Sequence, residues 1–85
     1  MAHFSISAQA ASSLGRCAAL ASTLHDVPVH VHDVMFAFAR SPDRGQVWIV
    51  RVMAPTLYQG EGKSAATALF ALEKALRDGI RERAD

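Results

Sequence analysis

Apolar residues recur at helical spacing near the start of the chain. Over residues 7–24 they return every three or four positions, and serine, glutamine and arginine occupy positions between them. Pro28 lies beyond the end of this pattern and cannot continue a helix. The spacing therefore predicts an amphipathic helix over 7–24, whose apolar stripe comprises Ala10, Leu14, Cys17, Ala18, Ala21 and Leu24.

The pattern changes to shorter β-type runs in the middle of the chain. Residues 29–41 and 46–54 are rich in β-branched and aromatic side chains, and a Ser-Pro-Asp-Arg-Gly break separates them. Two such runs around a turn predict an antiparallel hairpin. Side chains of the second run alternate between two faces, so we expect the apolar set to face the core and the mixed set to face outward. The apolar set is Trp48, Val50 and Val52, and the mixed set is Val47, Ile49, Arg51 and Met53.

A third short run and a second helix complete the pattern. Pro55 closes the second strand, residues 56–60 form a third one, and we expect Gly60 and Gly62 to end it. Ser64 is a favourable N-cap for a helix over 64–83. The order α-β-β-β-α predicts a single α+β domain over 1–85, with a three-stranded antiparallel sheet and two helices packed on one of its faces.

Composition narrows the classes of protein that fit. The chain has 85 residues, too few for a second domain, and 51% of them are hydrophobic. A formal net charge of +1 gives no strong field, so binding to phosphates requires a local basic patch. Cys17 is the single cysteine, which rules out an intrachain disulfide and favours a reducing, cytoplasmic compartment. No segment approaches the length of a membrane span.

The segment Gly60-Glu61-Gly62-Lys63-Ser64 is similar to the end of a phosphate-binding loop that leads into a helix. The complete loop, Gly-x-x-x-x-Gly-Lys-Ser, needs a first glycine where this chain has Leu57. The chain is also too short for the other strands and helices of a nucleotide-binding α/β domain. We therefore expect no cofactor here, and a turn whose glycines adopt unusual backbone angles.

The same segment resembles part of a double-stranded RNA-binding domain. That family has the order α-β-β-β-α, a turn after the first strand, an aromatic residue at the start of an alternating second strand, and Gly-x-Gly-x-Ser before the second helix. Residues 41–44 match the turn, 48–52 the strand and 60–64 the glycine segment, whereas upstream of Pro28 only the order of elements agrees. Small phage-type proteins also join such a hairpin to a helix. The small and aliphatic helix positions are matched by Ala68, Ala71, Leu72, Ala75 and Leu76.

The departures from that family fall on its binding surface. The resemblance implies that lysines at the start of the second helix hold phosphates, but the three lysine positions are Ala65, Ala66 and Leu69. At about 100° per residue, the small-residue stripe of this helix faces the sheet and Phe70 points nearly opposite to it. Apolar residues thus surround more of the helix than the sheet covers, which predicts a protein partner or a homodimer. The predicted partner surface comprises Ala66, Leu69, Phe70, Glu73, Arg77 and Ile80.

The leading hypothesis is a small non-catalytic module that acts through protein–protein interaction. Its role would be that of an adaptor, a dimerisation unit or a phage-type inhibitor of a nucleic-acid-processing or defence complex. A simpler alternative is that Phe70 is a single exposed aromatic residue and Leu69 only widens the core. The second hypothesis is weak binding of double-stranded RNA or another nucleic acid through the basic residues Arg16, Arg44, Arg51 and Lys63.

Residues that bind metals or carry out catalysis are few, and most lie in 25–33. On a strand, His30 and His32 would share one face, as a metal-binding pair requires, with His25 or Asp26 as a third ligand. Two histidines at a strand start are more often surface residues, so we expect no metal and keep His30 and His32 as weak candidates. No nucleophile, base and orienting acid have a spacing that predicts catalysis. We expect no catalytic residues and no small-molecule substrate.

Overall fold

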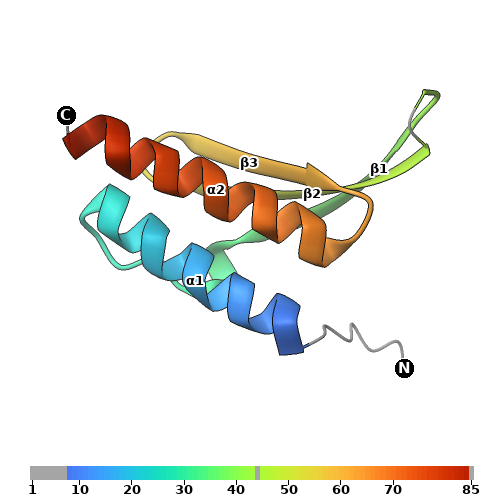
Figure 1. Ribbon diagram of the computed structural model, residues 1–85. Helices are drawn as coiled ribbons and strands as arrows, with labels where there is room; N and C mark the ends of the chain where they lie inside the picture. Colours follow the sequence, from blue (N-terminus) through green and yellow to red (C-terminus); the bar gives the residue numbers. More distant parts are fainter. Residues whose placement is uncertain (1–7, 44, 85) are drawn as a thin grey trace.

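The computed structural model describes residues 8–43 and 45–84 (Figure 1). Two helices and three strands follow one another in the predicted order α-β-β-β-α, with a short 3-10 helix before the first strand. Within these two ranges no helix has the length and apolar character needed to cross a membrane. The elements are α1 (Ala8–His25), η1 (Val31–Asp33), β1 (Met35–Ser41), β2 (Gly45–Met53), β3 (Leu57–Gly62) and α2 (Ala65–Ala84).

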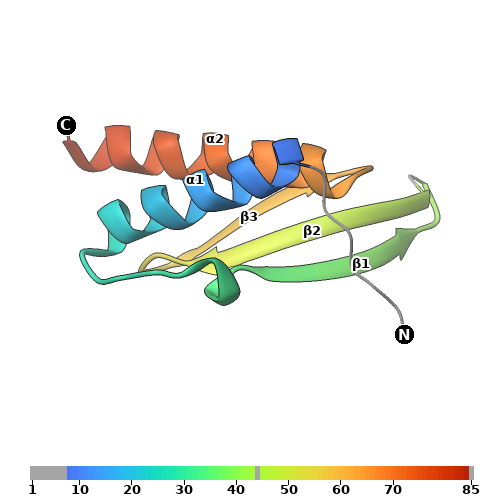
Figure 2. The same ribbon diagram turned by 90° about the horizontal axis from the view of Figure 1, so that it is seen from below.

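The three strands form an antiparallel meander in the order β1-β2-β3. Phe38 of β1 lies opposite Trp48 of β2, and Val50 of β2 lies opposite Gly60 of β3. Both helices lie on one face of this sheet, and no described element covers the other face (Figure 2). This is the predicted α+β arrangement. We call the uncovered side the outer face of the sheet.

The two faces of β2 largely follow the predicted alternation. Val50 and Val52 are fully buried beneath the helices, and Trp48 packs against the same core. On the outer face Met53 is 52% exposed, but Val47 is buried. Val47 lines a hollow of about 350 Å³ together with Lys63 of the connection from β3 to α2.

The first strand begins later than the residue pattern predicts. Residues 31–33 form the 3-10 helix η1, and β1 starts only at Met35. The Asp33 carboxylate accepts the His30 backbone N–H at 2.9 Å, and the Asp33 N–H donates to the His30 carbonyl at 2.9 Å. Such local side-chain bonds compete with strand pairing. The prediction that His30 and His32 lie on a strand is therefore wrong.

α1 ends before Pro28, as predicted. Asp26 adopts a left-handed φ of 62°, and its N–H donates to the Ser22 carbonyl at 3.0 Å. The Ser22 hydroxyl then accepts the Val29 N–H at 2.8 Å. These two bonds turn the chain back from the helix toward the sheet.

Gly62 is the last residue of β3, as predicted, whereas Gly60 lies inside the strand and does not end it. A Cβ atom at Gly60 would lie 2.3 Å from the Ala68 carbonyl oxygen and 2.3 Å from the Leu72 nitrogen, both backbone atoms of α2. Neither glycine has a positive φ. The predicted unusual backbone angles are therefore wrong, and these glycines instead let α2 pack directly on β3.

Candidate functional site

α2 packs against two neighbours, the sheet and α1 (Figure 1). The Ser64 hydroxyl accepts the Thr67 N–H at 3.1 Å, so the predicted N-cap is confirmed. The residues of α2 that are fully buried are Ala68, Leu69, Leu72 and Leu76.

Two members of the predicted partner surface are therefore buried, not exposed. Leu69 has 0% and Glu73 has 2% of its surface exposed. α1 covers both, since the Cys17 thiol lies 3.5 Å from the Leu69 carbonyl oxygen and Arg16 binds Glu73. The prediction failed because the helical wheel considered only the sheet as a packing surface. Leu69 belongs to the core, whereas Ala66 and Ile80 are partly buried at its margin.

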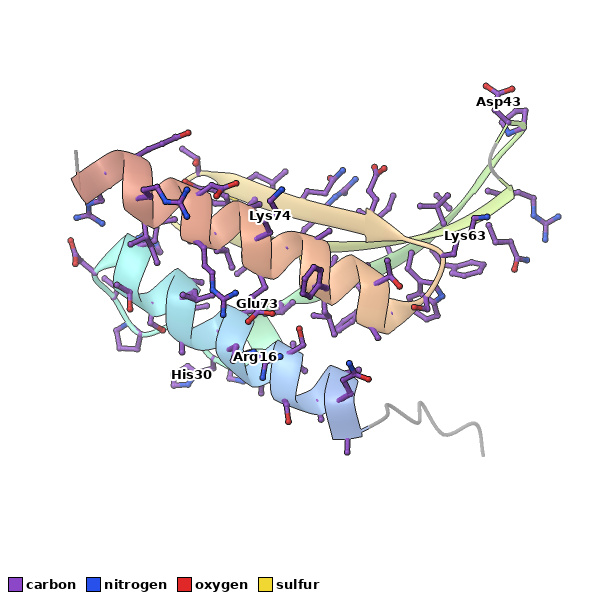
Figure 3. All side chains as sticks on the ribbon, viewed as in Figure 1. Arg16, His30, Asp43, Lys63, Glu73 and Lys74 are labelled. Carbon is purple, nitrogen blue, oxygen red and sulfur yellow. The ribbon has the colours of Figure 1, made fainter. Side chains whose placement is uncertain are left out.

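Glu73 is the centre of a polar network between the two helices. Its carboxylate accepts Arg16 Nε at 2.6 Å, an Arg77 guanidinium N–H at 2.9 Å and the Ser13 hydroxyl at 3.4 Å. Figure 3 shows Arg16 and Glu73 close together between α1 and α2. A buried carboxylate is costly unless it is paired and hydrogen-bonded, and this one is both. The network therefore has a structural role in joining α1 to α2.

Cys17 lies next to this network and is fully buried. Burial, reinforced by the negative charge of Glu73, raises the pKa of the Cys17 thiol to about 11. A thiol with this pKa is almost entirely protonated near neutral pH, and only the thiolate is a good nucleophile. Cys17 thus fits the core role expected from the helical stripe.

The exposed side of α2 carries one aromatic and three cationic residues. Phe70 is 66% exposed, and Lys74, Arg77 and Arg81 follow it at spacings of four, three and four residues. At 3.6 residues per turn these four positions fall within about 60° of one another around the helix. We call Phe70, Lys74, Arg77 and Arg81 the cationic ridge.

The cationic ridge has spare positive charge. Arg77 shares Glu73 with Arg16, whereas Lys74 and Arg81 form no salt bridge with any residue that the structure describes. Lys74 is exposed on α2 (Figure 3). The predicted surface included Phe70 and Arg77 but not Lys74 or Arg81. Their regular spacing from Phe70 was the sequence signal that could have found them.

The structure separates the basic residues proposed for nucleic-acid binding. Arg16 is held by Glu73 in the helix layer, and Arg51 on the outer face of the sheet donates to Gln59 at 2.8 Å. Lys63 lies in the connection between β3 and α2, well apart from Arg16 (Figure 3). Arg44 lies outside the described residues. The three described residues do not form one surface.

The weak metal candidates, His30 and His32, lie around η1 with their rings stacked, 5.3 Å between centroids and 9° from coplanar. The His32 ring is 3.7 Å from the Asp33 carboxylate. Among residues 8–43 and 45–84, no three histidine, cysteine or acidic side chains are grouped so that they could hold a metal ion. The third ligand that the sequence required is not brought to this pair.

The outer face of the sheet carries a second exposed region. Met35 and Met53 are each 52% exposed, and Leu57 opposite Met53 is 51% exposed. Met35, Met53 and the loop residue Val27 line one hollow of about 380 Å³. Exposed methionine side chains adapt to differently shaped partners. No described residue at this hollow indicates the chemistry of a particular partner.

No protein-family model, curated protein or solved structure matches the chain. The resemblance to double-stranded RNA-binding domains therefore rests on the quoted motifs and stays a prediction. The order and packing of the elements agree with that layout, and the function has to be argued from this molecule's own surfaces.

Proposed function

We propose that this chain is a small non-catalytic module that binds an acidic protein partner through the cationic ridge. The observation that supports the proposal is an aromatic side chain, Phe70, that is 66% exposed at one end of three regularly spaced cations. The opposite side of α2 is well packed, because Ala68, Leu69, Leu72 and Leu76 are fully buried against the sheet and α1. Exposure of the ridge is thus not a by-product of a loosely packed helix.

The chemistry of the ridge defines the partner. Large aromatic residues and arginines are enriched among the residues that dominate binding energy at interfaces. Phe70 would enter an apolar depression or contact an apolar side chain, and Lys74 and Arg81 would meet carboxylates. An acidic segment with an apolar anchor residue is the partner of matching chemistry. Such binding fits an adaptor or an inhibitor that occupies a surface on a larger complex.

Two ridge variants and one control variant are compared in a pull-down from the source organism, with the immobilised 85-residue chain. Phe70→Glu removes the aromatic side chain and adds a negative charge that an acidic partner would repel. The double variant Lys74→Glu/Arg81→Glu reverses the charge of the two cations that form no salt bridge within the described residues. Leu57→Glu, on the outer face of the sheet, is the matched control because Leu57 is exposed to a similar degree. We expect the same protein to be retained by wild type and by the control and lost from both ridge variants.

Nuclease treatment separates a protein partner from nucleic acid. We expect capture to survive nuclease and to weaken with added salt, because charged rim contacts are screened. Loss of the captured protein after nuclease, together with salt-dependent binding of a short RNA duplex, would support the nucleic-acid alternative instead. Equal capture by wild type and both ridge variants would contradict the proposal.

A further inference from the structure

β1 is an edge strand whose outer side has no neighbouring strand among the described residues. Along such an edge, alternate residues direct unpaired N–H and C=O groups away from the sheet. Natural edge strands are usually protected by proline, lysine, a bulge or a covering segment. β1 contains no proline, and Arg40 is its one charged residue. The edge is therefore open to pairing with another strand.

The side chains of β1 also leave apolar surface at this edge. Phe38 shares the helix-side face with its cross-strand partner Trp48, and the two rings pack edge to face with centroids 5.0 Å apart. Phe38 is nevertheless 53% exposed, because the β1–β2 hairpin extends beyond the helices (Figure 1). The exposed residues on the opposite face of β1 are Met35, Ala37 and Ala39.

We propose that two copies of the chain pair through β1 as antiparallel strands around a two-fold axis at Ala37. A two-fold axis perpendicular to the sheet keeps both helix layers on the same side, so residues that face each other must share a face. With the axis at Ala37, Phe36 of each copy faces Phe38 of the other, and Met35 faces Ala39. Two three-stranded sheets then join into one continuous sheet.

Charge complementarity selects this register. Arg40 is exposed and forms no salt bridge within the described residues, and the Asp33 side chain is 48% exposed. In the proposed register Arg40 faces Val34 of the other copy and lies beside that copy's Asp33. The two Arg40 residues are about 20 Å apart along the paired strands, farther than the screening length of about 8 Å at physiological salt. An axis at Phe38 would instead place Arg40 opposite Phe36 of the other copy, two positions farther from that copy's Asp33.

The size of the contact indicates a weak dimer. A seven-residue strand spans about 24 Å at about 3.4 Å per residue. A standard interface buries about 800 Å² per partner, roughly a seventh of the 5620 Å² surface of this chain. One strand edge with its flanking side chains covers less than that. We therefore expect a dissociation constant on the order of 10–100 µM.

Sedimentation velocity of the full chain from about 5 to about 500 µM tests the proposal, because dimer formation follows mass action. We expect the mass to rise from 9.2 kDa toward twice that value. Ala37→Lys places two like charges together at the axis and should weaken the dimer at least about tenfold. Thr56→Lys, exposed in the β2–β3 turn, is the matched control and should behave as wild type. Circular dichroism verifies that each variant is folded.

Two charge variants test the register. Arg40→Glu places a negative charge beside Asp33 of the other copy, and Asp33→Lys places a positive charge beside that copy's Arg40. Each variant alone should therefore be monomeric. In an equimolar mixture the introduced glutamate of one variant meets the introduced lysine of the other at one end of the paired strands. The unchanged Arg40 and Asp33 meet at the other end, so a heterodimer should form.

Three results decide the outcome. A wild type that stays monomeric at about 500 µM, a concentration well above the expected dissociation constant, overturns the proposal. A dimer insensitive to Ala37→Lys overturns it as well. A mixture of the two charge variants that stays monomeric overturns the register.

This contact does not depend on the cationic ridge. β1 is at one edge of the sheet, and α2 packs on β2 and β3. Phe70→Glu should leave the self-association unchanged, and Ala37→Lys should leave capture by the ridge unchanged. Either proposal can therefore fail without the other.

Discussion

Arg16 of α1 and Glu73 of α2 are joined by an Nε–Oε1 contact of 2.6 Å across 57 positions of sequence. The Glu73 side chain is 3% exposed and the Arg16 side chain 50% exposed, so the negative charge is the buried member of the pair. Arg77 reaches the same oxygen from one turn further along α2. Two half-exposed arginines therefore compensate one buried carboxylate at the helix interface.

This arrangement predicts unequal costs for removing the two arginines singly and together. Arg16→Gln or Arg77→Gln leaves Glu73 with one cation and should lower the free energy of unfolding by about 1 kcal/mol. The double variant leaves a buried carboxylate without a cation and should cost about 3–5 kcal/mol. Urea denaturation of the four proteins measures the coupling.

The exposed Arg81→Gln serves as the control and should change stability by less than about 0.5 kcal/mol. Strictly additive losses for Arg16 and Arg77 would show that the two arginines do not share the compensation of Glu73. That result would contradict the inference that Arg16 and Arg77 together compensate the buried charge of Glu73.

Truncating two adjacent residues of α2 to alanine should change the free energy of unfolding by very different amounts. Leu69→Ala opens a cavity between α1 and the sheet and should destabilise the fold by about 2–5 kcal/mol. Phe70→Ala removes an exposed ring and should change stability by less than about 0.5 kcal/mol. Thermal and urea unfolding of both variants provide the measurement. Similar losses at the two positions would contradict the burial that separates the core from the cationic ridge.

The features that could be predicted from sequence depend on local rules. The order of elements, the N-cap at Ser64 and the buried face of β2 follow from periodicity and from residue preferences near each position. They need no knowledge of what lies far away in the chain. For the same reason the helical spacing correctly predicts that Phe70, opposite the buried stripe, is exposed.

The features that could not be predicted depend on long-range packing. Whether Leu69 and Glu73 face solvent is decided by α1, which a wheel of one helix does not contain. The sequence predicts unusual backbone angles at the glycines of β3, whereas their need for close approach arises from α2. The β-branched residues around His30 and His32 predict a strand, but the local hydrogen bonds of Asp33 hold these residues in and beside η1. The open edge of β1 also becomes evident only once the strand order is known.

The raised pKa of Cys17 predicts a specific dependence of stability on pH. Folding raises the thiol pKa from an ordinary value of 9.0 to about 11, so above pH 9 the unfolded chain loses this proton more readily than the folded one. The contribution of the protonated Cys17 thiol to the free energy of unfolding is fully present below pH 9 and declines as the pH rises from 9 to about 11. Cys17→Ala lacks this contribution.

The stability difference between wild type and Cys17→Ala should therefore shrink across that pH range. Urea denaturation at several pH values measures it, and a thiol reagent at a pH of about 8 should modify the folded protein far more slowly than the unfolded one. A constant difference between wild type and variant, with rapid modification of the folded chain, would contradict the burial of this thiol.

Two glycine-to-alanine changes should have opposite signs. At Gly60 a Cβ atom would meet backbone atoms of α2 at 2.3 Å, which no change of side-chain rotamer can relieve. Gly60→Ala must push α2 away from β3 and should cost more than about 3 kcal/mol. Gly15, exposed within α1, has nothing within 4 Å of the added atom, so Gly15→Ala should stabilise the protein by about 0.5–1 kcal/mol. If urea denaturation showed that Gly60→Ala is tolerated, α2 would not be packed directly on the glycines that first suggested a phosphate loop.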